Sequence, residues 1–317
     1  MLNDRNPLLL VSIVIPAYNH ARYLSEAIDS VLNQDYSKIE LIVLDDGSTD
    51  NTAEVLQQYG NRFYWESHKN IGQANTLNKG WRMAKGDMLA YLSADDVLYP
   101  QAVSACADSL RNNPAAVLCY PDFQLIDPES RVVRNVIAPE YSYKEMVTKF
   151  ICAPGPGAFF RRDAYLKAGE WDPVLRHSPD YEYWLRLGLQ GSFFHVRQNL
   201  AAFRVHEGSQ SFAPTTVERA EEALRIIEKY YQLPNLPSEI IVAKKLAIAN
   251  ANIVVAQLHL RSARYRAAAV MIWKAIITAP RSLLSVRVLR MLANGLFNRF
   301  FHKLLWMIKN SLNSRSR

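Results

Sequence analysis

The run Leu8-Leu9-Leu10-Val11-Ser12-Ile13-Val14-Ile15 is apolar at every position except Ser12. A strand that is apolar on both faces is typical of a parallel sheet covered by helices. Pro16 and Asn19 break the run, and from Arg22 to Leu32 the apolar residues recur at helical spacing. The chain therefore opens with a buried strand followed by an amphipathic helix.

The same alternation continues through the first 120 residues. Further strands are predicted at 39–44, 62–65, 88–92 and 116–120, and further helices at 51–59, 73–84 and 100–110. This strand–helix order predicts the α/β class, with a mostly parallel, Rossmann-like sheet covered by helices.

Polar clusters follow three of these strands. They are Tyr18-Asn19, Asp45-Asp46-Gly47-Ser48 and Ser93-Ala94-Asp95-Asp96. Ligands of such sheets bind at the carboxyl ends of the strands. We therefore expect the three clusters to form a single site.

The remainder of the chain changes character. Residues 121–213 are less regular, and from about Thr215 the pattern is helical. We predict two domains, 1–213 and 214–317. Of the 37 Lys and Arg residues, 14 follow Ile240, where no Asp or Glu occurs.

The segment 283–312 reads as a basic amphipathic helix. Such a helix suits an anionic membrane surface, and docking on its own domain is the alternative. Nucleic acid is a weaker explanation of the charge because no recognition module is present, and we expect no nucleic-acid partner.

The three cysteines show no paired spacing, which favours reduced thiols over a disulfide or zinc site. The N-terminus does not resemble a signal peptide, and no apolar run reaches the ~18 residues that span a bilayer. We expect a cytoplasmic protein, free or peripheral on the inner face of the membrane.

The strand ends carry carboxylates in place of phosphate-binding glycines. No GxGxxG follows the first strand and no Walker A sequence occurs, which disfavours dinucleotide dehydrogenases and P-loop NTPases. Asp95 and Asp96 would repel each other unless a cation such as Mg²⁺ or Mn²⁺ binds them. A helix cap with a solvated loop charge is the alternative. Asp46 could likewise be a plain turn residue or an acceptor for a nucleobase or ribose.

Several segments, in this order and spacing, resemble the family 2 glycosyltransferases, over about Ser12 to Ser211. They are Val14-Ile15-Pro16-Ala17-Tyr18-Asn19, Ser30-Val31-Leu32-Asn33-Gln34, Leu44-Asp45-Asp46-Gly47-Ser48-Thr49-Asp50, Asn70-Ile71-Gly72-Gln73-Ala74-Asn75 with Leu77-Asn78-Lys79-Gly80, Ala84-Lys85-Gly86-Asp87, and Ser93-Ala94-Asp95-Asp96.

The resemblance implies the GT-A fold, a Rossmann-like nucleotide-sugar domain, here followed by an α-helical C-terminal region. It implies that Tyr18 lies near the base, that Asp46 binds the nucleoside, and that Asp95 and Asp96 hold Mn²⁺ or Mg²⁺ on the diphosphate. Ser93 departs from the family, whose usual first Asp it replaces. The donor-binding residues implied are Pro16, Tyr18, Asn19, Asp46, Asn75, Asn78, Asp95 and Arg204.

The second half supplies a candidate base. Asp180-Tyr181-Glu182-Tyr183-Trp184-Leu185-Arg186-Leu187 resembles the family segment that carries the catalytic Asp, and Asp180 aligns with that residue. A carboxylate there can take the proton of the attacking hydroxyl, although Asp180 could also be only a helix cap. Arg204-Val205-His206 resembles the closing segment, so His206 is a candidate metal ligand, with a structural role as the alternative.

The sequence thus predicts an inverting glycosyltransferase. We expect a nucleotide diphosphate donor, with UDP implied by the resemblance, and a saccharide or lipid-linked saccharide acceptor in cell-surface polysaccharide or glycolipid synthesis. A scaffold protein that keeps the fold without turnover is the alternative. A nucleotidyltransferase is disfavoured because residues 16–21 lack a basic, Gly-rich loop.

Overall fold

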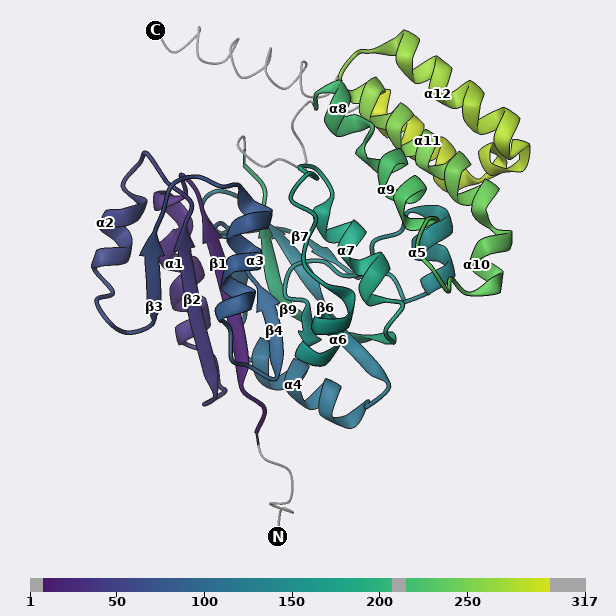
Figure 1. Ribbon diagram of the computed structural model, residues 1–317. Helices are drawn as coiled ribbons and strands as arrows, with labels where there is room; N and C mark the ends of the chain where they lie inside the picture. Colours follow the sequence, from purple (N-terminus) through teal and green to yellow (C-terminus); the bar gives the residue numbers. More distant parts are fainter. Residues whose placement is uncertain (1–7, 207–214, 297–317) are drawn as a thin grey trace, which may run out of the picture. The chain divides into compact units, whose positions relative to one another are not determined.

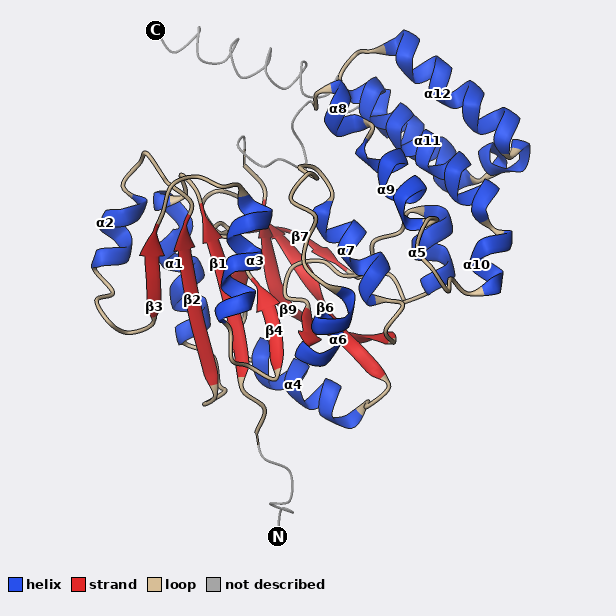
Figure 2. Ribbon diagram, viewed as in Figure 1, coloured by secondary structure: helices blue, strands red, loops and turns tan. Residues whose placement is uncertain are grey.

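The computed structural model describes residues 8–206 and 215–296 (Figures 1 and 2). Nine strands form one sheet within these residues. They are β1 (Val11–Ala17), β2 (Ile39–Asp45), β3 (Tyr64–Ser67), β4 (Met88–Tyr91), β5 (Val97–Leu98), β6 (Ala116–Ile126), β7 (Val132–Val136), β8 (Phe159–Arg161) and β9 (Ser192–Arg204).

Helices separate and follow these strands. In the first two-thirds of the chain they are α1 (Ala21–Leu32), α2 (Thr52–Gln57), α3 (Gln73–Met83), α4 (Ala102–Asn112), α5 (Tyr143–Lys149), α6 (Arg162–Ala168) and α7 (Pro179–Leu187). Later in the chain come α8 (Val217–Ala220), α9 (Glu222–Tyr230), α10 (Ser238–Val242), α11 (Lys244–Arg261), α12 (Tyr265–Thr278) and the 3₁₀ helix η1 (Pro280–Leu284).

The sheet is mostly parallel, as predicted. Its order is β3-β2-β1-β4-β8-β6-β9-β5, with β7 beside β6. The β3, β2, β1 and β4 strands are mutually parallel; β8 is antiparallel to both β4 and β6, and β9 is parallel to β6. Six strands therefore run in one direction, and β5, β7 and β8 run against them.

The opening apolar run lies at the centre of the sheet. Every residue of β1 is buried. Ile13 and Ile15 belong to a core cluster that also contains residues of α1 and α4. Val14 points to the other face, where a Cβ built on Gly80 of α3 would lie 2.4 Å from its side chain. Helices cover both faces, as the apolar pattern of β1, broken only at Ser12, predicts.

Element boundaries in the second half of the sheet differ from the predictions. Residues 116–126 form one strand, which continues through Pro121. The two short strands predicted between 193 and 205 are a single strand, β9, although Arg197, Gln198 and Asn199 within it are exposed. Register shifts between β6 and β9 near Pro121 and Asp122 accommodate this polar stretch.

The chain divides into two compact units. The first comprises residues 8–143, 152–175 and 179–206, and the second 144–151, 176–178 and 215–296. The predicted domain boundary at 213/214 falls outside the described residues. The sequence did not indicate that two short segments from the middle of the chain join the second unit.

The second unit is helical, as predicted. The core pairs α11 with α12, and α9 packs against α11. The buried Glu222 of α9 accepts the backbone N–H groups of Arg176 at 2.8 Å and His177 at 2.7 Å, which fixes that short segment. Residues 286–296 are helical, and the rest of the predicted basic tail lies outside the described residues. Within the described residues, no helix combines the length and apolarity needed to cross a membrane.

Candidate active site

The loops after β1 and β2 are bound to each other. Asn19 has a φ of 55°, a conformation that Asn adopts more readily than most residues. Its backbone N–H donates to Ser48 Oγ at 2.9 Å, and its side-chain oxygen accepts the Thr49 N–H at 2.7 Å. The preceding Tyr18 is 45% exposed. Asn19 therefore organises the strand-end loops and leaves the Tyr18 ring open to a ligand.

Asp46 anchors the loop that leads into α3. One carboxylate oxygen accepts the Ile71 N–H at 2.6 Å and the other accepts the Gly72 N–H at 2.9 Å. The side chain of Asn75 donates to the Ile71 carbonyl at 2.8 Å, on the same turn. His68 Nδ1 lies 3.7 Å from Asp46. The buried carboxylate thus holds the start of α3 beside the carboxyl end of β2.

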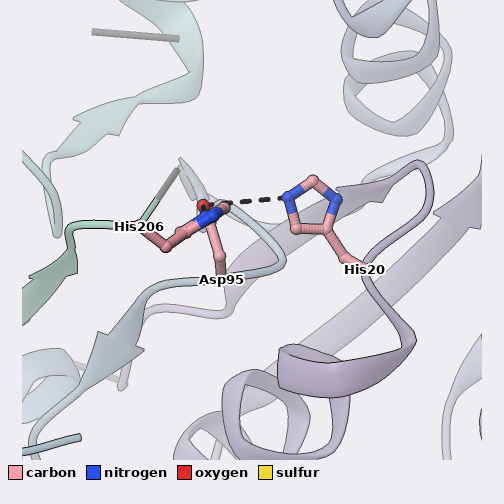
Figure 3. Close-up of side chains that lie close together, drawn as sticks. All are labelled: His20, Asp95 and His206. Carbon is pink, nitrogen blue, oxygen red and sulfur yellow. Dashed lines mark hydrogen bonds and ion pairs between the residues drawn. The ribbon is translucent and has the colours of Figure 1, made fainter. Parts of the chain in front are cut away.

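Three side chains from distant parts of the sequence meet at the next strand end (Figure 3). His206 Nε2 lies 2.9 Å from Asp95 Oδ2, and His20 Nε2 lies 3.7 Å from the same oxygen. One ligand atom from each residue lies within 4.8 Å of the others. His20 precedes α1, Asp95 lies between β4 and β5, and His206 follows β9. The arrangement is a 2-His-1-carboxylate cluster.

The pKa values of the adjacent carboxyl groups move in opposite directions. Burial raises the pKa of Asp95, but His20 and His206 outweigh it and hold that pKa below its ordinary value. Burial, and then the charge of Asp95, raise the pKa of Asp96 well above its ordinary value. Burial lowers the pKa of His20, and the neighbouring Asp95 more than compensates, so the net shift is upward. Asp95 is the anion of the cluster.

Arg204 lies behind the cluster and is fully buried. Its Nε donates to the Asp95 carbonyl at 2.8 Å, and a terminal nitrogen pairs with Glu26 at 2.7 Å. The guanidinium carbon lies 4.7 Å from the centroid of the Tyr23 ring, whose centroid is 5.1 Å from that of the His206 ring. Arg204 therefore holds the Asp95 backbone through a hydrogen bond and packs against the Tyr23 ring, which in turn contacts the His206 ring.

Asp180 occupies the first turn of α7. Burial raises the pKa of its carboxyl group, although backbone N–H groups, that of Tyr181 first, act in the opposite direction. Tyr91, the last residue of β4, has a pKa raised well above its ordinary value by burial and then by the charges of Asp180, Cys152 and Asp96. Asp180 and Asp96 are thus both electrostatic neighbours of the Tyr91 hydroxyl.

The residues predicted from the sequence fall into two groups. Asp95 and His206 meet in the cluster, with Tyr18, Asn19 and Asp46 on adjoining strand-end loops and Asn75 in the first turn of α3. Of the others, Pro16 and Arg204 lie in strands, Asn78 and Asp180 lie in helices, and Asp96 follows Asp95 in the loop. Asp96 is buried and accepts the Arg204 N–H at 2.9 Å. Asn78 exchanges two hydrogen bonds with the Trp171 backbone, at 2.8 and 2.9 Å, and Pro16 pairs with Leu44 within the sheet.

Asp96 and Asn78 thus bond to the protein backbone, and the metal-binding and donor-binding roles expected of them stay predictions. The second carboxylate of the Asp95-Asp96 pair does not join the cluster found among the described residues, because it turns toward the β9 backbone. His20 takes its place. Sequence reasoning missed His20 because a single histidine beside a motif carries no signal of its own until the fold brings it to Asp95.

Comparison with known proteins identifies the family of this chain. The sequence model described as Glycosyl transferase family 2 matches residues 12–168. An uncharacterized glycosyltransferase of Rickettsia typhi is 32% identical over 232 residues, which are 71% of this chain and 70% of that protein. Chondroitin synthase of Escherichia coli is 33% identical over 195 residues, 60% of this chain and 28% of the synthase.

Solved structures share the fold. TarS 1–349 of S. aureus, in complex with UDP-GlcNAc, has a TM-score of 0.61 and 16% identity over 86% of this chain and 91% of that chain. Mannosyltransferase PcManGT from Pyrobaculum calidifontis, in complex with GDP-Man and Mn²⁺, has a TM-score of 0.57 and 16% identity over 88% of each chain. The chain therefore belongs to glycosyltransferase family 2 and has the GT-A fold.

Proposed function

We propose that this protein is a divalent-metal-dependent, inverting glycosyltransferase that moves a sugar from a nucleotide diphosphate to an acceptor hydroxyl. The observation that carries the proposal is the meeting of Asp95 with His20 and His206 at the carboxyl ends of the strands. Ligands of open α/β sheets bind at this edge. Asp46 and Tyr18, at the two neighbouring strand ends, are the proposed contacts of the nucleoside.

The ligand atoms of His20, Asp95 and His206 suit a transition metal ion. Two imidazole nitrogens and one carboxylate oxygen lie within 4.8 Å of one another, and Asp95 is held in its ionised form. Imidazole favours Mn²⁺ over Mg²⁺, which prefers oxygen ligands and retains its water. His20, Asp95 and His206 would hold the ion, with Asp96 behind them. When bound, such an ion neutralises the charge that develops on the departing diphosphate.

Asp180 is the proposed general base. Its place at the start of α7 puts it within electrostatic reach of Tyr91, at the end of the strand that leads to Asp95. A carboxylate whose pKa is raised by burial is a stronger proton acceptor than an ordinary aspartate. Asp180 would accept the proton of the acceptor hydroxyl as that oxygen attacks the anomeric carbon from the side opposite the diphosphate.

A UDP-sugar is the proposed donor and a saccharide or lipid-linked saccharide the proposed acceptor, in cell-surface polysaccharide or glycolipid synthesis. Relatives named chondroitin synthase and hyaluronan synthase support a role in polysaccharide synthesis. We also propose that the protein works in the cytoplasm, peripherally on the inner face of the membrane. The basic segment 283–312 motivates this placement.

Turnover tests the proposal and separates it from the scaffold alternative. The purified chain would be incubated with UDP-sugars, Mn²⁺ and an array of saccharide acceptors, with release of UDP as the readout. The enzyme releases UDP in an acceptor-dependent way, and proton NMR of the product shows the anomeric configuration inverted from that of the donor. Donor binding without any release of UDP would favour the scaffold, and retained configuration would contradict the inverting mechanism.

A further inference from the structure

Helix α12, in the second unit, is apolar on two opposite faces. One face, with Ala268, Met271 and Ala275, is buried in the helical core of the unit, where α12 runs alongside α11 (Figure 1). Three residues on the opposite face are large, apolar and exposed: Val270 is 51%, Trp273 63% and Ile277 65% exposed. A helix that is apolar all round is normally buried on all sides. This stripe is therefore a surface that a partner would cover.

The spacing of the stripe makes it continuous. Val270, Trp273 and Ile277 are separated by three and four positions, so they project along one side of the helix. The exposed Arg266 lies one turn before Val270 on this side, and the exposed Lys274 borders it next to Trp273. We call these five residues the α12 face. It has the composition of a helix that rests in the plane of a lipid interface, with tryptophan among aliphatic residues and cations at the border.

The charged residues of α12 and of the chain that follows it are all basic. No Asp or Glu follows Glu239 in the sequence. Arg281 and Arg290, which follow α12, are also exposed, and in the helical residues 286–296 Leu289 is exposed beside Arg290. An anionic surface complements such a region. A second copy would bring cation against cation if the same faces met.

We propose that the α12 face is a docking surface for an anionic lipid bilayer, with Trp273 inserted at the interface and the surrounding Lys and Arg residues on the lipid headgroups. This inference adds a membrane-contacting face to the proposed function. It needs neither the donor nor the acceptor to be known, since docking is measured without turnover. Its failure would therefore leave the transferase proposal untouched, and an inactive protein could still dock.

Vesicle flotation with matched variants tests the proposal. Val270→Glu and Trp273→Glu change the α12 face, and Val242→Glu is the control. Val242 is a valine of α10 that is 86% exposed in the same unit, so it gains the same charge away from the face. The wild-type chain should float with vesicles of phosphatidylcholine and phosphatidylglycerol and not with phosphatidylcholine alone. Each face variant should bind at least about tenfold more weakly, while Val242→Glu stays within about twofold of wild type.

Three further measurements complete the test. All three variants should melt at the wild-type temperature, because every substituted side chain is exposed. If a face variant melts at a lower temperature, Trp273→Ala is used in its place. A chain that ends at residue 296 should still bind anionic vesicles, and Val270→Glu should abolish that binding. The proposal is overturned if the face variants bind like Val242→Glu, or if removing 297–317 alone abolishes binding. It is also overturned if light scattering shows a wild-type dimer that Val270→Glu dissociates, since the face would then hold a second copy.

Discussion

At the scale of single residues, the cluster around Asp95 differs in chemistry from the paired carboxylates that the sequence indicates. The sequence predicted Asp95, Asp96 and His206 as ligands. The structure brings His20 and His206 to Asp95 and turns Asp96 toward Arg204. Two imidazole nitrogens and one carboxylate oxygen are ligands that suit transition metal ions such as Mn²⁺. A set of ligands made only of oxygen atoms would favour Mg²⁺. The proposed ligand set of His20, Asp95 and His206 therefore predicts a different metal preference from a pair of carboxylates.

We expect Mn²⁺ to bind more tightly than Mg²⁺ in the presence of UDP, and His20→Ala to weaken Mn²⁺ binding by at least about tenfold. Electron paramagnetic resonance of free Mn²⁺ measures both. His177→Ala is the control, because His177 belongs to the second unit and lies outside the cluster. Equal affinities for the two ions, or an unchanged Mn²⁺ affinity in His20→Ala, would exclude His20 as a ligand.

A second residue-scale prediction concerns Asp180. As a general base it must be ionised, and burial raises its pKa, so activity should rise with pH through a value above that of an ordinary aspartate. Asp180→Asn should lower kcat by roughly 10²–10⁴-fold and leave donor binding intact. The pH profile of kcat/KM and the donor affinity of the variant check both statements. An unchanged kcat in Asp180→Asn would remove the residue from the mechanism.

At the scale of elements, β9 is part of the sheet and also positions Arg204 next to Asp95. The sequence predicted two short strands there because Arg197, Gln198 and Asn199 interrupt the apolar pattern, and the register shifts that keep β9 continuous leave no signature in the sequence. Arg204 is the last residue of this continuous strand, and its side chain is fully buried next to Asp95. Its Nε and terminal nitrogens donate to the Asp95 carbonyl, the Asp127 carbonyl, Ser130 and Glu26.

Arg204→Ala should therefore destabilise the protein, by on the order of 3 kcal/mol, because it removes a fully buried side chain and leaves the partly buried acceptors around it without their donors. Arg197→Ala is a matched control on the same strand. Its side chain is 75% exposed and pairs with Glu140, so its removal should change the free energy of unfolding by less than about 1 kcal/mol. Denaturant unfolding followed by tryptophan fluorescence measures both. Equal losses in the two variants would contradict the role of Arg204 in holding the Asp95 backbone.

At the scale of the whole molecule, sequence patterning predicts the order of strands and helices well, but it does not reveal the two short segments that join the second unit. The buried strands of the sheet are visible as apolar runs because both of their faces are covered. Residues 144–151 and 176–178 belong to the second unit through contacts made far along the chain, such as those of Glu222 with the 176–178 backbone. No local pattern could reveal such pairings.

A candidate site residue can be proposed from the sequence only where a local motif contains it. Asp46, Asp95 and Asp180 stand in segments that resemble family motifs, so the local sequence was enough to propose them. His20 could not, since its partner lies on another loop. The engagement of Asn78 by the Trp171 backbone is likewise a tertiary contact between residues distant in the sequence.

A chain that ends at residue 213 should be poorly folded, because it retains residues 144–151 and 176–178 and removes the helices that complete their unit. The buried Met146 and Val147 of α5 would lose the helices of the second unit that surround them. A chain that ends at residue 296 is the control and should melt as the full chain does. Thermal melting followed by circular dichroism compares them. A cooperative, unshifted transition in the 1–213 chain would show that the first unit needs no second.

Thermal stabilisation by ligands tests whether the protein has a nucleotide-sugar site that depends on a metal at Asp95. Wild type and Asp95→Asn would be melted with a panel of UDP- and GDP-sugars, each with Mn²⁺, Mg²⁺ or chelator. A ligand at about 100 times its dissociation constant stabilises the folded chain by roughly 2.7 kcal/mol. We predict that a UDP-sugar raises the melting temperature of wild type with Mn²⁺, and that chelator or Asp95→Asn removes the shift. An equal shift in Asp95→Asn, or no shift with any nucleotide sugar and metal, would contradict the account.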